Sequence, residues 1–124
     1  MEEQSSKMTP ETMEDRLIEF GSRILDLVEK LPKKPTAKHL GGQIMRSGTS
    51  PALNYGEAQA AESRDDFIHK MRICLKELRE TLVCLKLIVK RDWFPAGRMA
   101  PLLTESKELV AIFVASIKTA SSKK

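Results

Sequence analysis

The spacing of the apolar residues constrains the fold of this chain more than any other feature of its sequence. Between residues 13 and 31, apolar side chains recur in alternating steps of four and three, at Met13, Leu17, Phe20, Ile24, Leu27 and Leu31. This spacing predicts a helix with a single apolar seam that packs nearly parallel to its neighbours. Pro32 and Pro35 then end the helix, because proline lacks the N–H group that a continuing helix needs.

Two later stretches have the same spacing. The first follows Ser63 and Asp66, a pair typical of a capping box, and contains Phe67, Met71, Cys74, Leu78, Leu82, Leu85 and Val89. The second follows the loop "WFPAGRMAP" and contains Leu102, Ser106, Leu109, Phe113, Ile117 and Ala120. If residues 36–61 form a further helix, the simplest fold is all-α, an up-and-down antiparallel four-helix bundle over residues 10–120. We expect residues 1–9 to be disordered and residues 121–124 to be a frayed tail.

The composition agrees with this fold class. Only six of the 124 residues are aromatic, which suits aliphatic helices better than a β-sandwich. No apolar run approaches the length of a membrane span and the N-terminus lacks the form of a signal peptide, so we expect a cytoplasmic protein without a membrane partner. Cys74 and Cys84 lie about 15 Å apart along one predicted helix, so we expect buried free thiols.

The segment "GGQIMRSGTSPALNYGEAQ", residues 41–59, predicts an unusual helix because it is rich in glycine and holds Pro51. At 100° per residue its polar residues share one arc of about 100°. These residues, the polar stripe, are Gln43, Arg46, Ser47, Ser50, Asn54 and Glu57. The opposite face, expected to enter the core, carries Gly41, Ile44, Met45, Gly48, Ala52 and Tyr55. Pro51 deprives the Ser47 carbonyl of its helical donor and is expected to kink the helix.

The polar stripe has two interpretations. It is either a solvated face or a close interface with another copy of the chain. We favour the interface, because a solvated face usually carries Lys and Glu, whereas Ser, Asn and Gln are neutral or poor in helix interiors. Short polar groups suit a contact in which each finds a specific partner.

These residues carry a resemblance to a known family. "QIMRSGTSPALNYGEA", followed by "SRDDFIHKMRICLKELRETLVCLKLI", resembles the four-helix bundle family of 23S rRNA intervening-sequence proteins over about residues 13–117. The most specific part is the polar stripe, followed by Asp66-Phe67 and Glu77. The sequence departs from the family at Ala58, where Gly is common, and at Pro51-Ala52-Leu53. A more distant relative is the accessory variability determinant of diversity-generating retroelements, which is basic and binds a reverse transcriptase. The resemblance implies a ring-shaped homo-oligomer, often a pentamer, without an established biochemical activity.

The predicted helix after Ser63 also carries a row of cations. Within an arc of about 80° and over about 27 Å of helix lie Arg72, Lys76, Arg79, Lys86 and Lys90, which we call the basic row. Residues 1–31 hold four basic and eight acidic residues, so the rest of the chain is more basic than the net charge of +4 suggests. The row is either a solvated face that pairs with Glu77, Glu80 or the acidic first helix, or a track for nucleic-acid phosphates.

No catalytic, metal or cofactor site is predicted. His39 and His69 have no companion at metal-ligand spacing, and Cys74 and Cys84 lack the close spacing of a zinc site. Glu57 and Glu77 lack the Glu-x-x-His pattern of di-iron bundles. The pair Trp93-Phe94 is expected to close the end of the bundle, with an exposed anchor for a partner protein as the alternative.

The sequence therefore predicts a non-catalytic, self-associating bundle protein that binds nucleic acid, with RNA preferred, through the basic row. Its expected partners are further copies of the chain in a ring and an RNA or RNA–protein complex, with no small-molecule substrate. The alternative is an oligomeric scaffold for protein interactions that does not bind nucleic acid.

Overall fold

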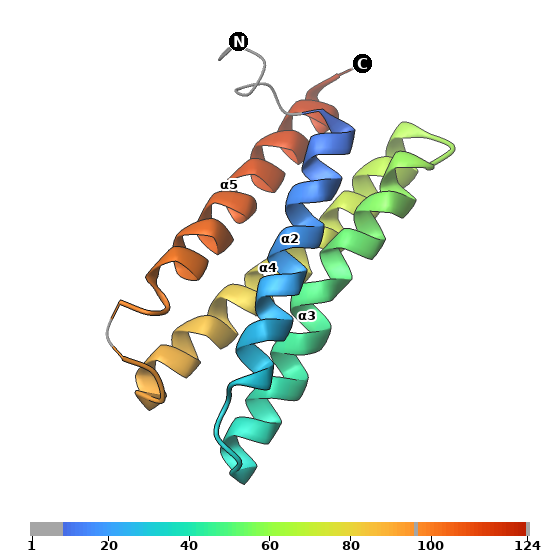
Figure 1. The fold of residues 1–124 in the computed structure, drawn as a ribbon. Helices are drawn as coiled ribbons and strands as arrows, with labels where there is room; N and C mark the ends of the chain where they lie inside the picture. The colour runs from blue at the N-terminus through green and yellow to red at the C-terminus, as the bar shows by residue number, and fades with distance from the viewer. Residues whose placement is uncertain (1–8, 96, 124) are drawn as a thin grey trace.

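The structure is a computed structural model that describes residues 9–95 and 97–123 and folds them into four helices (Figure 1). Their bounds are Pro10–Glu29 for α2, Pro35–Gln59 for α3, Arg64–Arg91 for α4 and Ala100–Ser122 for α5. Each helix runs antiparallel to the one before it, so α2 begins and α5 finishes at the same end of the molecule (Figure 1). The predicted all-α four-helix bundle is confirmed.

The helices pack in a fixed order around the core. α3 packs against α2 and α4, and α5 packs against α4 and, less extensively, against α2. α2 and α4 are therefore diagonal partners. Across the other diagonal, the rings of Tyr55 and Phe113 meet edge to face with their centroids 5.8 Å apart. Arg16 ties α2 to α5, because its Nε lies 2.7 Å from Glu105 Oε2 and its Nη2 lies 2.8 Å from Glu108 Oε1.

Side-chain caps fix where two of the helices begin. Thr9 caps α2: its hydroxyl accepts from the Thr12 N–H and its own N–H donates to the Thr12 hydroxyl. Ser63 caps α4, with the Asp66 N–H donating to its hydroxyl at 3.0 Å, which is the N-cap half of the predicted capping box. Residues 1–8 of the N-terminal segment expected to be disordered lie outside the described residues. At the other end, α5 continues through Ser122 into the segment expected to fray.

Most residues of the predicted apolar seams form the core, but some, such as Phe67 and Leu82, are only half-buried and two are exposed. Val89 was expected in the seam of α4 but is 42% exposed, and Ile88 is buried in its place. A seam with a strict repeat of seven drifts by about 20° per heptad on a straight helix, so the last position rotates outward. Met45 was expected on the core face of α3 but is 43% exposed, because it lies at the edge of that face beside α2.

Small residues allow α3 to fit between its neighbours. A Cβ atom on Gly48 would lie only 2.8 Å from Ile24 Cγ2, and one on Gly21 would lie 3.4 Å from the Gly48 carbonyl oxygen. The helix is continuous through the buried Pro51. The Asn54 amide donates to the Ser50 carbonyl and hydroxyl, one turn before it, at 3.1 and 2.8 Å.

The cysteines and the aromatic pair occupy the places expected from the sequence. Cys74 and Cys84 are buried free thiols, and Cys74 Sγ lies 3.7 Å from the Pro51 carbonyl oxygen. Burial raises the pKa of the Cys74 thiol to about 12 and also raises that of Cys84. Trp93 and Phe94 are half-buried and pack against the core after α4.

The close contact between Gly48 and Ile24 leads to a prediction about stability. Gly48→Ala should lower the free energy of unfolding by about 1 kcal/mol, because overpacking against the buried Ile24 outweighs the gain in helix propensity. Gly56 on the same helix is the matched control. A Cβ atom there meets nothing within 4 Å, so Gly56→Ala should raise stability by roughly 0.5–1 kcal/mol. Urea denaturation followed by circular dichroism measures both changes, and equal stabilities of the two variants would contradict the predicted contact.

The raised thiol pKa makes a second prediction. In the native protein at pH 8, Cys74 should react with iodoacetamide far more slowly than in the urea-unfolded chain. The unfolded thiol ionises near its ordinary value of 9.0, whereas the folded thiol stays protonated to about 12. The stabilising contribution of this thiol is therefore complete below pH 9 and is lost as the pH rises toward 12. Mass spectrometry of timed alkylation measures the protection, and equal rates in the two states would refute it.

Candidate functional site

The polar stripe of α3 lies over the seam between α3 and α4. At this seam Arg46, a residue of the stripe, forms ion pairs with two glutamates of α4. Arg46 Nη1 donates to Glu77 Oε1 at 2.9 Å, and its Nη2 donates to Glu80. The Glu77 carboxylate is largely buried, with a side-chain exposure of 9%, so it requires a cationic partner. These contacts raise the pKa of Arg46, and the hydrogen bond that Arg46 donates to Glu77 is the largest cause.

The other residues of the polar stripe differ in burial and in the contacts that they form within the chain. Ser47 is fully buried, and its hydroxyl accepts from Thr81 Oγ1 at 2.9 Å. Ser47 therefore belongs to the packing between α3 and α4 and is not available at the surface, where the interface prediction had placed it. Glu57 is exposed but lies 3.6 Å from Lys70 Nζ, and Gln43 is exposed.

The surface beside the stripe carries apolar side chains. Leu53 on α3 is 73% exposed, and Leu87 on α4, about 20° from Glu80 by helical geometry, is also exposed. Helical geometry places Leu53 at the edge of the polar stripe, about 20° from Arg46. The outer face of the α3–α4 pair thus combines short polar groups, a closed ion-pair cluster and exposed aliphatic residues.

The five cations of the basic row all lie on the exposed ridge of α4, opposite its core-facing side. Within residues 9–95 and 97–123, none of the five forms an ion pair. The two carboxylates that could have neutralised the row, Glu77 and Glu80, bind Arg46 instead. The acidic helix α2 is diagonal to α4, and the two backbones do not come close to each other.

Two features make the basic row a weaker binding surface than five adjacent cations would be. Helical geometry places Val83, which is 57% exposed, in the middle of the row between Arg79 and Lys86. Lys90 lies in the last turn of α4, where a cation stabilises the helix dipole without any ligand. The row is therefore two cationic segments separated by an apolar residue.

The described part of the chain offers little support for a metal site or a histidine-based site. There, no three or more His, Cys, Asp or Glu side chains gather closely enough to hold a metal ion. His39 and His69 are exposed on different helices. No helix among the described residues is both long enough and apolar enough to span a membrane.

Three residues of the α3–α4 seam had no predicted role in it. Thr81 and Lys70 hold stripe residues, and Glu80 binds Arg46 rather than the basic row. One signal in the sequence pointed to this arrangement: helical geometry puts Glu77 beside the core face of α4, where a carboxylate needs a partner. The identity of that partner depends on how α3 and α4 are aligned, which periodicity alone does not provide.

Comparisons with known proteins agree with this architecture. The sequence matches the family described as 23S rRNA-intervening sequence protein over residues 13–115. A comparison with curated proteins gave no significant match. Among solved structures, a Bacteroides thetaiotaomicron protein, described as a protein with unknown function from the S23 ribosomal protein family, is similar with a TM-score of 0.81. Its sequence is 33% identical, and the alignment covers 90% of this chain and 99% of that one.

Neither the family description nor the description of that structure names an enzymatic activity. Because the family match extends over most of the bundle and agrees with the shared fold, the chain belongs to the 23S rRNA-intervening sequence protein family.

Proposed function

We propose that the protein is a non-catalytic cytoplasmic bundle that self-associates through the outer face of α3 and binds RNA through the basic row of α4. The observation that supports RNA binding best is the set of five exposed cations that form no ion pair within the described residues. Like charges one turn apart, such as Arg72 and Lys76, repel each other unless a polyanion offsets them.

RNA is a suitable polyanion for this surface. The row is about 27 Å long, so it could contact several successive phosphates of one strand. The family takes its name from intervening sequences of 23S rRNA, which associates it with RNA. Contacts to phosphates would give affinity with little sequence preference.

We expect the protein to bind labelled single-stranded RNA with a log–log salt slope of roughly −3.5 if all five cations contact phosphates. Arg79→Glu combined with Lys86→Glu should abolish this binding and leave the fold intact, because both side chains are exposed. Fluorescence anisotropy across a salt series measures the effect.

A control variant separates the basic row from net charge. Lys107→Glu combined with Lys118→Glu changes the charge by the same amount at exposed positions on α5 and should retain binding. If both double variants lose binding equally, the effect is one of overall charge and the assignment to α4 fails. If the unchanged protein does not bind RNA even at low salt, the alternative of a protein scaffold is favoured.

Self-association rests on a different set of residues. Gln43, Ser50, Asn54 and Leu53 lie on the exposed or half-buried surface of α3, next to the ion pairs of Arg46. In a closed assembly each copy would present this face to a neighbour, and the basic rows of several copies would add to one strong field.

Sedimentation velocity should show a discrete oligomer that Leu53→Glu dissociates, because the substitution buries a charge in the proposed interface. Val114→Glu, at an exposed aliphatic position on α5, should leave the oligomer intact. A monodisperse monomer of the unchanged protein would disprove self-association while leaving the RNA experiment interpretable.

A further inference from the structure

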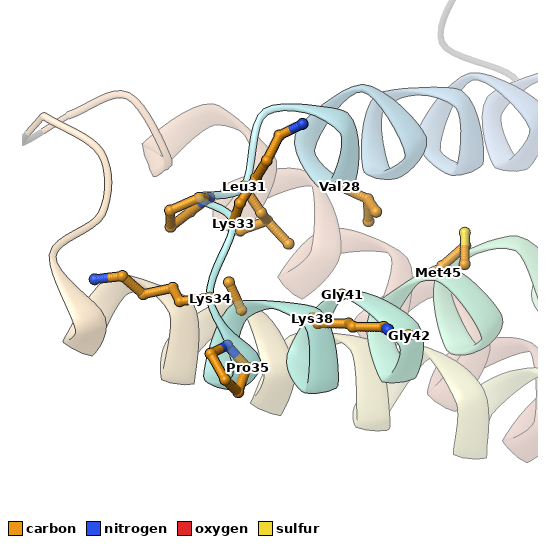
Figure 2. A pocket seen from close by; sticks show the side chains of 11 residues that line it. Val28, Leu31, Lys33, Lys34, Pro35, Lys38, Gly41, Gly42 and Met45 are labelled. Carbon is orange, nitrogen blue, oxygen red and sulfur yellow. The ribbon is translucent and has the colours of Figure 1, made fainter.

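The turn between α2 and α3 forms a hollow that no motif in the sequence predicts. Its volume is about 850 Å³, within the range of small-molecule sites. Figure 2 shows Val28 and Leu31 on one side of it and Gly41, Gly42 and Met45 on the other. Most of its lining is apolar, and the buried Ala37 adds to the same wall.

The rim of the hollow is cationic. Lys38 extends along the first turns of α3 toward Gly42, whereas Lys33 and Lys34 extend from the turn in other directions, and all three side chains are exposed (Figure 2). None of them forms an ion pair among the described residues, although Glu29 ends the neighbouring helix α2.

The first turn of α3 provides no negative charge to offset these three lysines. α3 has no acidic residue in its first turn, and its N-cap residue Lys34 makes no capping hydrogen bond. The positive end of the helix dipole therefore adds to the lysine charges instead of opposing them. An anion bound beside the apolar wall would reduce the repulsion among the lysines and the repulsion between the lysines and the positive end of the helix dipole.

We propose that this hollow binds a small amphiphilic carboxylate, with the hydrocarbon part against Val28, Leu31 and Met45, the head group near Lys38, and Lys33 and Lys34 adding to the positive field at the turn. This site is separate from the basic row of α4, and it does not depend on RNA binding. The apolar wall supplies affinity in proportion to buried hydrocarbon, and the lysines select for negative charge.

Gly42 makes the proposal testable without harming the fold. It lines the hollow, and a Cβ atom there would meet nothing within 4 Å. Gly42→Met should therefore fold at least as well as the unchanged protein, because methionine favours helix more than glycine does, while its side chain fills the site. Gly56→Met is the matched control, since Gly56 is equally open on the same helix and does not line the hollow.

The experiment titrates the full chain with decanoate below its micelle-forming concentration, followed by ¹H–¹⁵N chemical shifts and calorimetry. We expect shifts centred on the turn and on Gly41 and Gly42, and roughly ten-fold weaker binding of octanoate, which lacks two methylenes. Gly42→Met should lose the binding and Gly56→Met should keep it.

The head group is tested separately. Replacing Lys33, Lys34 and Lys38 together with Gln should weaken decanoate binding by roughly ten-fold, whereas the same change at Lys76, Lys86 and Lys90 on α4 should not. Decyltrimethylammonium, which has the same chain and the opposite charge, should bind poorly. Absence of decanoate binding, equal binding of the cation, or retained binding by Gly42→Met would each overturn the proposal.

Discussion

The fit of α3 between α2 and α4 is the contact on which the rest of this structure depends. α3 packs against both neighbours, and its face carries Gly48 where the buried Ile24 of α2 must enter. Any larger residue at Gly48 would push α2 away, and Arg46, Ser47 and the buried Pro51 are placed by the same alignment. The same two helices border the hollow at the α2–α3 turn, where Gly42 leaves open space and Gly41 packs closely against Leu31.

The order of the helices also separates the charges of the molecule. The acidic helix α2 lies diagonally opposite α4, so its carboxylates cannot reach the basic row. The two nearby carboxylates on α4 itself are occupied by one cation from α3, Arg46. A chain of modest net charge thereby presents a cationic ridge whose side chains form no ion pair within residues 9–95 and 97–123, together with a second cationic region at the turn.

The sequence predicted the helices well and the surface contacts less well. Met13, Leu17, Phe20 and Ile24 were expected in the core and are buried there, because apolar periodicity follows directly from helical geometry. Periodicity was wrong for Val89 at the end of α4, because a repeat of seven residues rotates away from the core a little more with each heptad of a straight helix. For the polar stripe it placed Gln43 and Glu57 at the surface, where they lie, but Ser47 binds Thr81 inside the bundle, and Arg46 binds carboxylates that had been considered as partners for the basic row.

The sequence by itself determined the number and extent of the helices, their apolar faces, the cap at Ser63 and the burial of both cysteines, since each of these depends on residues close together in the chain. Only the tertiary structure decided which carboxylates Arg46 would bind, that the basic row would form no ion pair with the rest of the described chain, and that three lysines would border an apolar hollow. These properties depend on the alignment and diagonal order of the helices, and that alignment is set by packing between residues distant in sequence, such as Ile24 with Gly48 and Ser47 with Thr81.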